Sequence, residues 1–241
     1  MKYIHHYNTE QDFQNTYNGE DYNEPWVSLT ETAEPHVDYN KTAPTMPSVD
    51  LGLQSGNLWA EYNLGASSVS EPGEYYAWAE LSPKTAYTKN NYEFYDAPGD
   101  LYTKYNSLST MQLQPEDDVV YVTLGNGWSV PTMDDFEELT QNCTISYIYD
   151  QETSTNYAVY TSNINGNSIR FVDNGYCDGQ SSNDTQHIYL WTNRVIDDCG
   201  SPNFSKAEYA EGSAMYDVDF SGKEFPRYYG MGIRPIFKSI G

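Results

Sequence analysis

The stretch Tyr189-Leu190-Trp191-Thr192-Asn193 predicts an apolar, aromatic strand, and the stretch Arg227-Tyr228-Tyr229-Gly230-Met231-Gly232-Ile233-Arg234-Pro235-Ile236-Phe237 predicts another. The polar run between them shows no regular pattern. A rigid frame around an irregular, Tyr-rich insert is typical of a recognition surface, because loops on a scaffold carry function and Tyr gives large contact area at low entropy cost. The same stretches also fit a simple closing hairpin of a β-rich domain, and the two interpretations remain open.

The charge balance excludes some partners. The chain has 241 residues, with 12 basic and 35 acidic side chains and a net charge of −23. Such a chain repels phosphate backbones, and binding to nucleic acid depends on Lys and Arg that neutralise phosphates. An anionic membrane surface is disfavoured for the same reason. We therefore expect no nucleic-acid ligand and no membrane association.

Targeting signals and cysteines indicate where the chain folds. No apolar signal region follows Met1, and no apolar stretch is long enough to span a bilayer. The three cysteines, Cys143, Cys177 and Cys199, are an odd number and lie far apart, which is no disulfide framework. We expect a chain made in a reducing cytoplasm, with a Cys177–Cys199 bridge as the alternative.

Residues 1–47 differ in composition from the rest of the chain. They hold many Tyr, Asn, Glu and Thr and few aliphatic residues, and a proline-spaced linker, Thr42-Ala43-Pro44-Thr45-Met46-Pro47, ends them. Such an arm buries too little apolar surface to fold alone, so it is disordered or docked on a partner. We expect it to attach the chain to a larger assembly through Phe13, Tyr17 and Trp26.

From residue 48 to residue 241 the pattern predicts one α+β domain with short strands, two helices and long loops. Strands are expected at 49–53 and 58–63 around the Gly56-Asn57 turn signal, at 73–79, and at 157–160 and 168–172 around the Asn165-Gly166 turn signal. Residues 81–114 are expected to form a long polar loop. One helix is expected to start at Pro115, followed by acidic residues that complement the helix dipole.

The second helix has the clearest start signal. Thr132 is the expected N-cap, and Asp135 completes a capping box. Phe136, Leu139 and Cys143 share one apolar face, where Cys143 is expected to be an inert core thiol.

An ordered set of motifs resembles a known family, the Fibrobacter succinogenes major paralogous domain. The motifs, over about residues 48–238, are Val49-Asp50-Leu51-Gly52-Leu53, Trp59-Ala60, Asn63-Leu64-Gly65-Ala66, Gly73-Glu74-Tyr75-Tyr76-Ala77-Trp78-Ala79-Glu80, Pro115-Glu116-Asp117-Asp118, Gly127-Trp128-Ser129-Val130-Pro131-Thr132, Asn165-Gly166-Asn167-Ser168-Ile169, Leu190-Trp191-Thr192 and Gly232-Ile233-Arg234-Pro235. The resemblance implies a C-type-lectin-like, formylglycine-generating-enzyme-like fold, found in gut Bacteroidota and their phages.

The resemblance also implies where a ligand binds. In variable proteins of this fold, the stretch between the Trp strand and the Arg-Pro strand displays the ligand-binding residues, which corresponds here to about residues 191–231. Ser221-Gly222-Lys223-Glu224-Phe225-Pro226 departs from the usual Asn- or Ser-rich pattern, so active diversification is in doubt. The cysteine pair of the enzyme that names the fold has no counterpart here, so its oxidative chemistry is not carried over. The arm also resembles N-terminal segments of gut-phage structural proteins.

No catalytic or metal-binding pattern is found among the reactive residues. His5, His6, His36 and His187 lack metal-ligand spacing, and no nucleophile elbow, phosphate loop or dinucleotide fingerprint is present. The carboxylate pairs Asp197/Asp198 and Asp217/Asp219 could ligate calcium, but a solvated surface is preferred in so acidic a chain. We expect no enzyme activity, no cofactor and no metal.

These observations predict a bacteriophage virion protein, a head or tail fibre or a capsid decoration, that adheres to a host protein or glycan. The alternative is a bacterial cell-surface adhesin of the same fold. The chain is expected to contact other virion proteins through its arm and to be a homo-oligomer. The candidate ligand-binding residues mix aromatic anchors with a polar rim: Asn193, Arg194, Asp197, Asn203, Phe204, Tyr209, Met215, Asp217, Lys223, Phe225 and Tyr228. Trp191 is expected in the core, and Arg234-Pro235 is expected to be structural.

Overall fold

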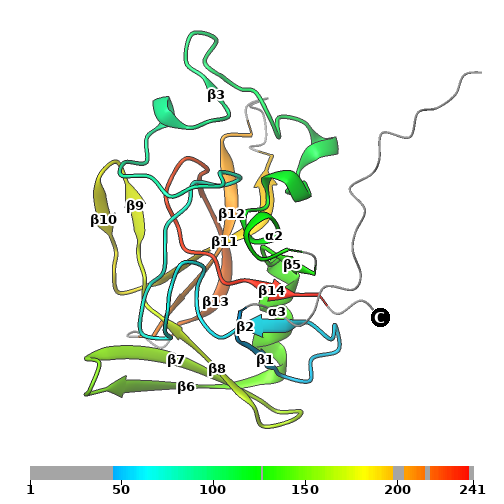
Figure 1. Cartoon of the computed structure of the whole chain (residues 1–241), viewed down its shortest axis with the longest axis vertical. Helices are drawn as coiled ribbons and strands as arrows, with labels where there is room; N and C mark the ends of the chain where they lie inside the picture. The colour runs from blue at the N-terminus through cyan, green and yellow to red at the C-terminus, as the bar shows by residue number, and fades with distance from the viewer. Residues whose placement is uncertain (1–45, 126, 198–203, 215–217, 239–241) are drawn as a thin grey trace, which may run out of the picture. The chain divides into compact units, whose positions relative to one another are not determined.

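The computed structural model describes residues 46–125, 127–197, 204–214 and 218–238. These residues form small antiparallel sheets, two α-helices and long loops, which is an α+β arrangement (Figure 1). The expected arm, with Phe13, Tyr17 and Trp26, lies outside the described residues. In the described part of the chain, no helix is long and apolar enough to cross a membrane.

One four-stranded sheet joins the two ends of the described chain. Its strands run in the order β1–β2–β14–β5, with β14 paired to β2 through Ile236 and Trp59. The expected hairpin around Gly56-Asn57 is confirmed, because β1 and β2 pair antiparallel. The bounds are β1 Ser48–Asp50, β2 Leu58–Ala60, β5 Trp128–Ser129 and β14 Ile236–Phe237.

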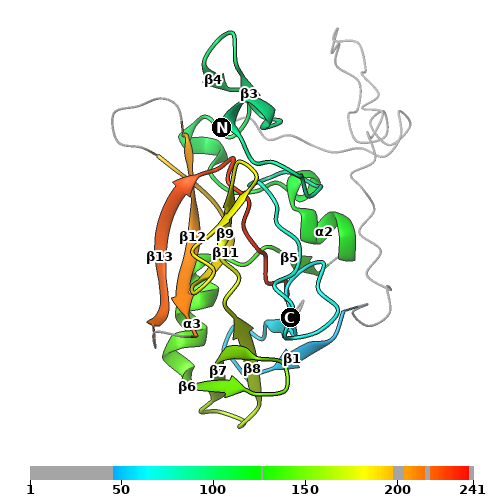
Figure 2. The same ribbon diagram turned by 90° about the vertical axis from the view of Figure 1, so that its left-hand side faces the viewer.

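A second sheet of three strands lies beside the helix α3 (Figure 2). Its order is β11–β12–β13, and α3 packs on β12 and β13. The bounds are β11 Ile188–Ile196, β12 Lys206–Ser213, β13 Val218–Pro226 and α3 Met133–Asn142. The interpretation of residues 194–226 as an irregular insert is therefore wrong: two long strands occupy most of it, since β12 gains hydrogen-bonding partners on both sides.

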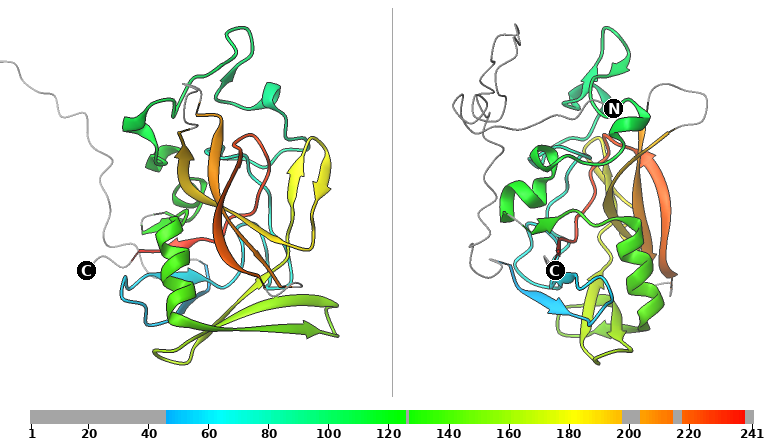
Figure 3. Two further views of the ribbon diagram at one scale, coloured as in Figure 1. Left: turned by 180° about the vertical axis from the view of Figure 1, so that it is seen from behind. Right: turned by 90° about the vertical axis from the view of Figure 1, so that its right-hand side faces the viewer.

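A third sheet has the order β6–β7–β8 and follows α3 directly (Figure 3). The Asn165-Gly166 hairpin prediction is confirmed by the antiparallel pairing of β7 with β8. Two small hairpins complete the strands. The bounds are β6 Cys143–Asp150, β7 Thr155–Ser162, β8 Ser168–Val172, β9 Tyr176–Asp178, β10 Ser181–Asn183, β3 Tyr95–Asp96 and β4 Leu101–Tyr102.

The helix predictions hold for one helix and need correction for the other. Thr132 caps α3, and its reciprocal capping box with Asp135 is present. Pro115 begins only a 3₁₀ turn, η3 Pro115–Asp117, and the helix α2 Val119–Leu124 starts after Asp118. The Asp118 carboxylate is the N-cap, accepting from the backbone N–H of Val120 and of Tyr121.

Two other segments differ from expectation. Residues 73–79 form no strand: Tyr76 makes a single bridge to Met231, and Ala79 has a φ of 67° that ends the extended run. The expected loop at 81–114 contains the β3–β4 hairpin and two short 3₁₀ turns, η1 Lys89–Asn91 and η2 Leu108–Thr110. The final stretch is a strand only at β14, preceded by single bridges at Gly230, Met231 and Gly232.

Buried aromatic residues dominate the core. Trp78, Trp128 and Trp191 belong to one large cluster, and Trp59 and Phe136 belong to a second. Trp191 is 1% exposed and Arg234 is 1% exposed, so the expected core and structural roles are confirmed. Arg234 donates to the adjacent carbonyls of Ala60 and Glu61 and to the Arg170 carbonyl, which ties the final stretch to the end of β2 and to β8.

Candidate binding site

Six aromatic side chains are linked by ring contacts beside the β11–β12–β13 sheet, and we call them the aromatic shelf. They are Tyr176, Tyr189, Tyr209, Phe225, Tyr228 and Tyr229. Pairing explains why the sheet residues share a face. Tyr209 lies opposite both Trp191 and Lys223, and side chains directly opposite in a ladder point to the same side.

A single bridge brings the remaining members to the sheet. The Cys177 N–H donates to the Gly230 carbonyl at 2.7 Å, and the Gly230 N–H donates back to Cys177 at 2.9 Å. Tyr176 and Tyr229 are the neighbours of these two residues, so their rings are held together. Glycine is required at 230, because an added Cβ would lie 2.8 Å from the Tyr87 ring.

The rings pack in a continuous array. Tyr176 and Tyr229 have centroids 5.6 Å apart and planes only 8° from parallel. Phe225 stacks on Tyr209 at 5.1 Å and tilts against Tyr176 at 5.0 Å. Contacts of this kind add stability beyond the area they bury, so the array is held rigid.

Burial divides the shelf into a base and a surface. Tyr189 and Tyr209 are 3% and 4% exposed and belong to the core. Tyr176, Phe225, Tyr228 and Tyr229 are half-buried. Rings that are part exposed yet fixed from below lose little entropy when a ligand packs on them.

Acidic side chains surround these rings. Burial first, and then the nearby Asp178 carboxylate, raises the pKa of Tyr229 to about 12. The same causes, burial and then Asp178, raise the pKa of Tyr176. These phenols therefore stay protonated at neutral pH and can donate hydrogen bonds, while the exposed Asp178 can accept them.

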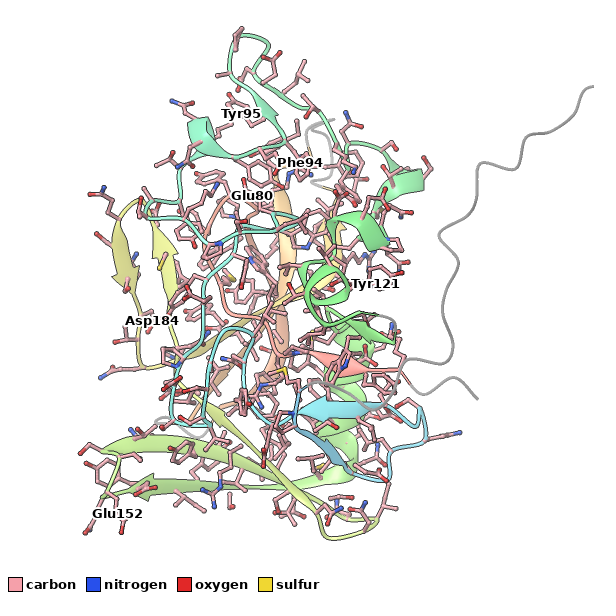
Figure 4. The ribbon with its side chains drawn as sticks, viewed as in Figure 1. Glu80, Phe94, Tyr95, Tyr121, Glu152 and Asp184 are labelled. Atoms are coloured by element: carbon pink, nitrogen blue, oxygen red, sulfur yellow. The ribbon has the colours of Figure 1, made fainter. Side chains whose placement is uncertain are left out.

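Asp184 is a second carboxylate beside the shelf and lies at the foot of the β9–β10 hairpin (Figure 4). Its Oδ2 accepts from the Tyr189 hydroxyl at 2.7 Å, and its Oδ1 lies 2.7 Å from His187 Nδ1. Burial alone would raise the pKa of Asp184, but the hydrogen bonds from Tyr189 and with His187 together lower it below its ordinary value. The arrangement offers ring faces, phenol donors and carboxylate acceptors in one place, which is chemistry for binding.

The structure brings only some of the predicted site residues together. Phe225 and Tyr228 are on the shelf, and Lys223 lies exposed beside Tyr209 on β13. Asn193 and Arg194 lie away from the shelf. The backbone of Arg194 forms a single β-bridge with Gln112, and Arg194 lines a surface hollow of about 310 Å³ with Leu108 and Met111. Asp197 is half-buried after the end of β11. Asn203, Met215 and Asp217 are outside the described residues, as are Asp198 and Cys199.

Two of the predicted contact residues are buried. Phe204 is 5% exposed and packs in the same core cluster as Trp191 and Val195. Tyr209 is 4% exposed, because it lies in the central strand with Trp191 and Lys223 on either side. The expectation that they contact a ligand directly is therefore wrong: Phe204 is a core residue, and Tyr209 supports the shelf from below.

Sequence reasoning missed Tyr176, Tyr229 and Asp178. Tyr229 stands in the quoted final stretch, but nothing in the pattern separates it from its neighbours. Tyr176 and Asp178 flank Cys177 outside the expected insert, and only the bridge to Gly230 brings them to the shelf. A long-range contact of this kind has no local signal.

Neither a metal-binding group in the described residues nor a known relative indicates another site. Within the described ranges, no group of three or more His, Cys, Asp and Glu residues could hold a metal ion. No family model matches the chain, and no match is found among curated proteins or solved structures.

Proposed function

We propose that this chain is a non-enzymatic binding protein that holds a host-surface protein or glycan on the aromatic shelf. The observation that carries the proposal is the set of half-buried rings fixed on a buried base, with Tyr176 and Tyr229 stacked in parallel. Aromatic residues in such settings dominate binding energies, because they bury large areas and keep a polar handle.

Charge narrows the ligand class. Asp178 and Asp184 are exposed at the shelf, and the whole chain has a net charge of −23. Ligands rich in phosphate or carboxylate are repelled by this field. A neutral saccharide face or a neutral to basic protein surface satisfies both the rings and the carboxylate acceptors.

The wider setting of this binding protein is proposed from sequence resemblance. We propose a C-type-lectin-like domain displayed on a bacteriophage virion, as a fibre or a capsid decoration, with residues 1–47 as the attachment arm. The small antiparallel sheets, two helices and long loops of the described residues are compatible with that fold. A bacterial cell-surface adhesin of the same fold would use the same shelf.

The shelf is tested by binding of the labelled full chain to immobilised glycans and to a panel of gut Bacteroidota cells. Tyr229→Ala and Phe225→Ala should each weaken binding about 30-fold, the effect of losing a hot spot of about 2 kcal/mol. Tyr121→Ala on α2, labelled in Figure 4, is the matched control because it removes a half-buried Tyr away from the shelf. Thermal unfolding is measured for each variant. Unchanged binding by folded shelf variants would move the site elsewhere.

The assembly is tested separately by deleting residues 1–47. The shortened chain should still unfold cooperatively, yet it should be absent from purified phage particles. Incorporation at the level of the full chain would contradict the attachment role. Recovery of the full chain on bacterial cells without phage would favour the adhesin.

A further inference from the structure

A lysine, a buried carboxylate and a side-chain amide meet in the segment that follows Trp78. Glu80, labelled in Figure 4, is only 5% exposed. The Lys84 Nζ lies 2.6 Å from its Oε2 and 2.8 Å from its Oε1. The same Nζ lies 3.5 Å from Oδ1 of Asn91. An amine, a proton acceptor and an acyl group are the parts that an acyl transfer needs.

The Lys84 side chain is held in one orientation toward Asn91. Its Nζ also donates to the Asn91 backbone carbonyl at 3.0 Å. The rings of Tyr87 and Tyr92 lie beside it, each with its centroid 5.9 Å from Nζ. Fixing two groups of one chain in contact is the condition that speeds a reaction between them.

The Glu80 carboxylate is held from a second side. The Glu93 N–H donates to Oε1 at 2.7 Å, so this oxygen lies between the Glu93 backbone and the Lys84 amine. Only a neutral amine is a nucleophile, and a lysine must lose a proton before it can attack. The Glu80 carboxylate is in contact with the ammonium and is the base that can take that proton.

The Asn91 amide is oriented by two backbone groups. The Thr88 N–H donates to Oδ1 at 3.0 Å, and Nδ2 donates to the Ala86 carbonyl at 2.8 Å. A fixed N–H at the oxygen stabilises the negative charge that develops there when the carbonyl carbon is attacked. One hydrogen bond therefore activates the amide, and the other fixes its direction.

We propose that Lys84 and Asn91 form an isopeptide bond, with Glu80 as the catalytic base and acid. Glu80 takes a proton from the Lys84 ammonium, and the lone pair of the neutral Nζ attacks Cγ of Asn91. The electron pair of the C=O bond moves to Oδ1, beside the Thr88 N–H. Glu80 then passes its proton to Nδ2 and takes a second proton from Nζ.

The bond is completed when the electron pair on Oδ1 forms the C=O bond again. The Cγ–Nδ2 bond then breaks, and Nδ2 leaves as ammonia. Ammonia takes the remaining proton from Glu80, so an ammonium ion departs and Glu80 is a carboxylate again. The step needs no oxidant, reductant or cofactor, because carbon and nitrogen keep their oxidation states.

The bond closes a loop that supports the aromatic shelf. Tyr87 lies within this loop and exchanges two backbone hydrogen bonds with Gly179, at 2.7 Å and 2.8 Å. Its ring lies against Gly230, whose bridge to β9 holds the shelf together. Bond formation is independent of any ligand, so its test and the binding test of the shelf can fail separately.

The experiment is an intact-mass measurement of the purified full chain, followed by tryptic mapping. The chain of 27.5 kDa should be lighter than its sequence by one ammonia. Trypsin cleaves an unlinked chain after Lys84 and after Lys89. In the linked chain, peptide 42–89 should stay joined to peptide 90–104, because the modified Lys84 is not cleaved. Imide formation at an Asn-Gly pair also loses ammonia, but it leaves peptide 42–84 free.

Three variants should keep the full sequence mass. Lys84→Arg keeps the charge but has no primary amine, Asn91→Ala has no acyl group, and Glu80→Gln cannot take the proton. Lys89→Arg is the matched control, since Lys89 also pairs with a carboxylate, Asp100, at 2.8 Å in the same segment. This control should lose ammonia as the wild type does.

Two results would overturn the bond. One is a wild type of full mass that releases peptide 42–84, and the other is an ammonia loss that persists in Lys84→Arg. A folded Glu80→Gln chain that is still linked would overturn the role of Glu80. Circular dichroism checks the folding of each variant. If Glu80→Gln does not fold, the wild type and Lys84→Arg still decide whether the bond forms.

Discussion

The guanidinium carbon of Arg227 lies 4.0 Å from the centroid of the Tyr102 ring, and the Arg227 side chain is fully buried. No ion pair with a carboxylate is found for Arg227 within the described residues. Its Nη2 donates to the Lys104 carbonyl at 2.8 Å and its Nη1 donates to the Tyr105 carbonyl at 3.2 Å. Burial lowers the pKa of this guanidinium, while the surrounding Tyr rings act against that shift. Cation–π contact and backbone acceptors thus replace a counter-ion.

Arg227 is therefore expected to hold the loop at residues 102–105 against the start of the final stretch. Arg227→Ala should lower the free energy of unfolding by about 3 kcal/mol or more, because it leaves a cavity and two carbonyls without donors. Arg227→Lys should cost less but should not restore wild-type stability, since an ammonium lacks the planar fork. Urea unfolding measures both changes. Wild-type stability of Arg227→Ala would show that the buried cation contributes no net stabilisation.

The sequence predicts correctly those helix starts and turns that are determined by a few residues adjacent in the chain. The Thr132 cap, the Asn165-Gly166 turn and the Gly56-Asn57 turn are all present as expected. β12 and β13 were missed because Lys206–Ser213 is rich in Ala, Gly and Glu, which favour no strand. These residues form a strand because β12 pairs with β11 on one side and β13 on the other, and pairing between distant segments leaves no local signal in the sequence.

The candidate site was found only in part for the same reason. Phe225 and Tyr228, predicted by their place in the insert, are half-buried and in contact with other rings of the shelf. Tyr176 reaches them only through the bridge between Cys177 and Gly230. Phe204 was assigned to the surface because its neighbours are polar, whereas the fold turns it into the cluster around Trp191.

The buried position of Phe204 can be tested against Arg194, another predicted contact residue, which is exposed. Phe204→Ala should lower the free energy of unfolding by about 3–5 kcal/mol, as for other buried Phe residues. Arg194→Ala should change it by no more than about 0.5 kcal/mol, because that side chain is exposed. Thermal and urea unfolding of both variants provide the comparison. Equal, small effects would show that Phe204 is not part of the core.

Glu208 lies opposite Glu224 in the β12–β13 ladder. Burial first, together with the like charges of Asp134 and Glu137, raises the pKa of Glu208 above its ordinary value of 4.5. The Thr192 hydroxyl, which donates to Oε2 at 3.0 Å, and the Arg194 cation oppose that shift.

The sign of the pH effect follows from this direction. A carboxyl with a raised pKa in the folded state binds its proton more tightly there than in the unfolded state, so protonation stabilises the fold. That stabilisation is present below the unfolded pKa and is lost as the pH rises through the folded pKa. Glu208→Gln should therefore raise the melting temperature at pH 7, and the gain over wild type should shrink towards about pH 4. Glu152→Gln removes the same charge from an exposed hairpin tip and should show no such gain. A Glu208→Gln gain that is constant with pH, or that matches the gain of Glu152→Gln, would indicate a general effect of net charge and not the local burial of Glu208.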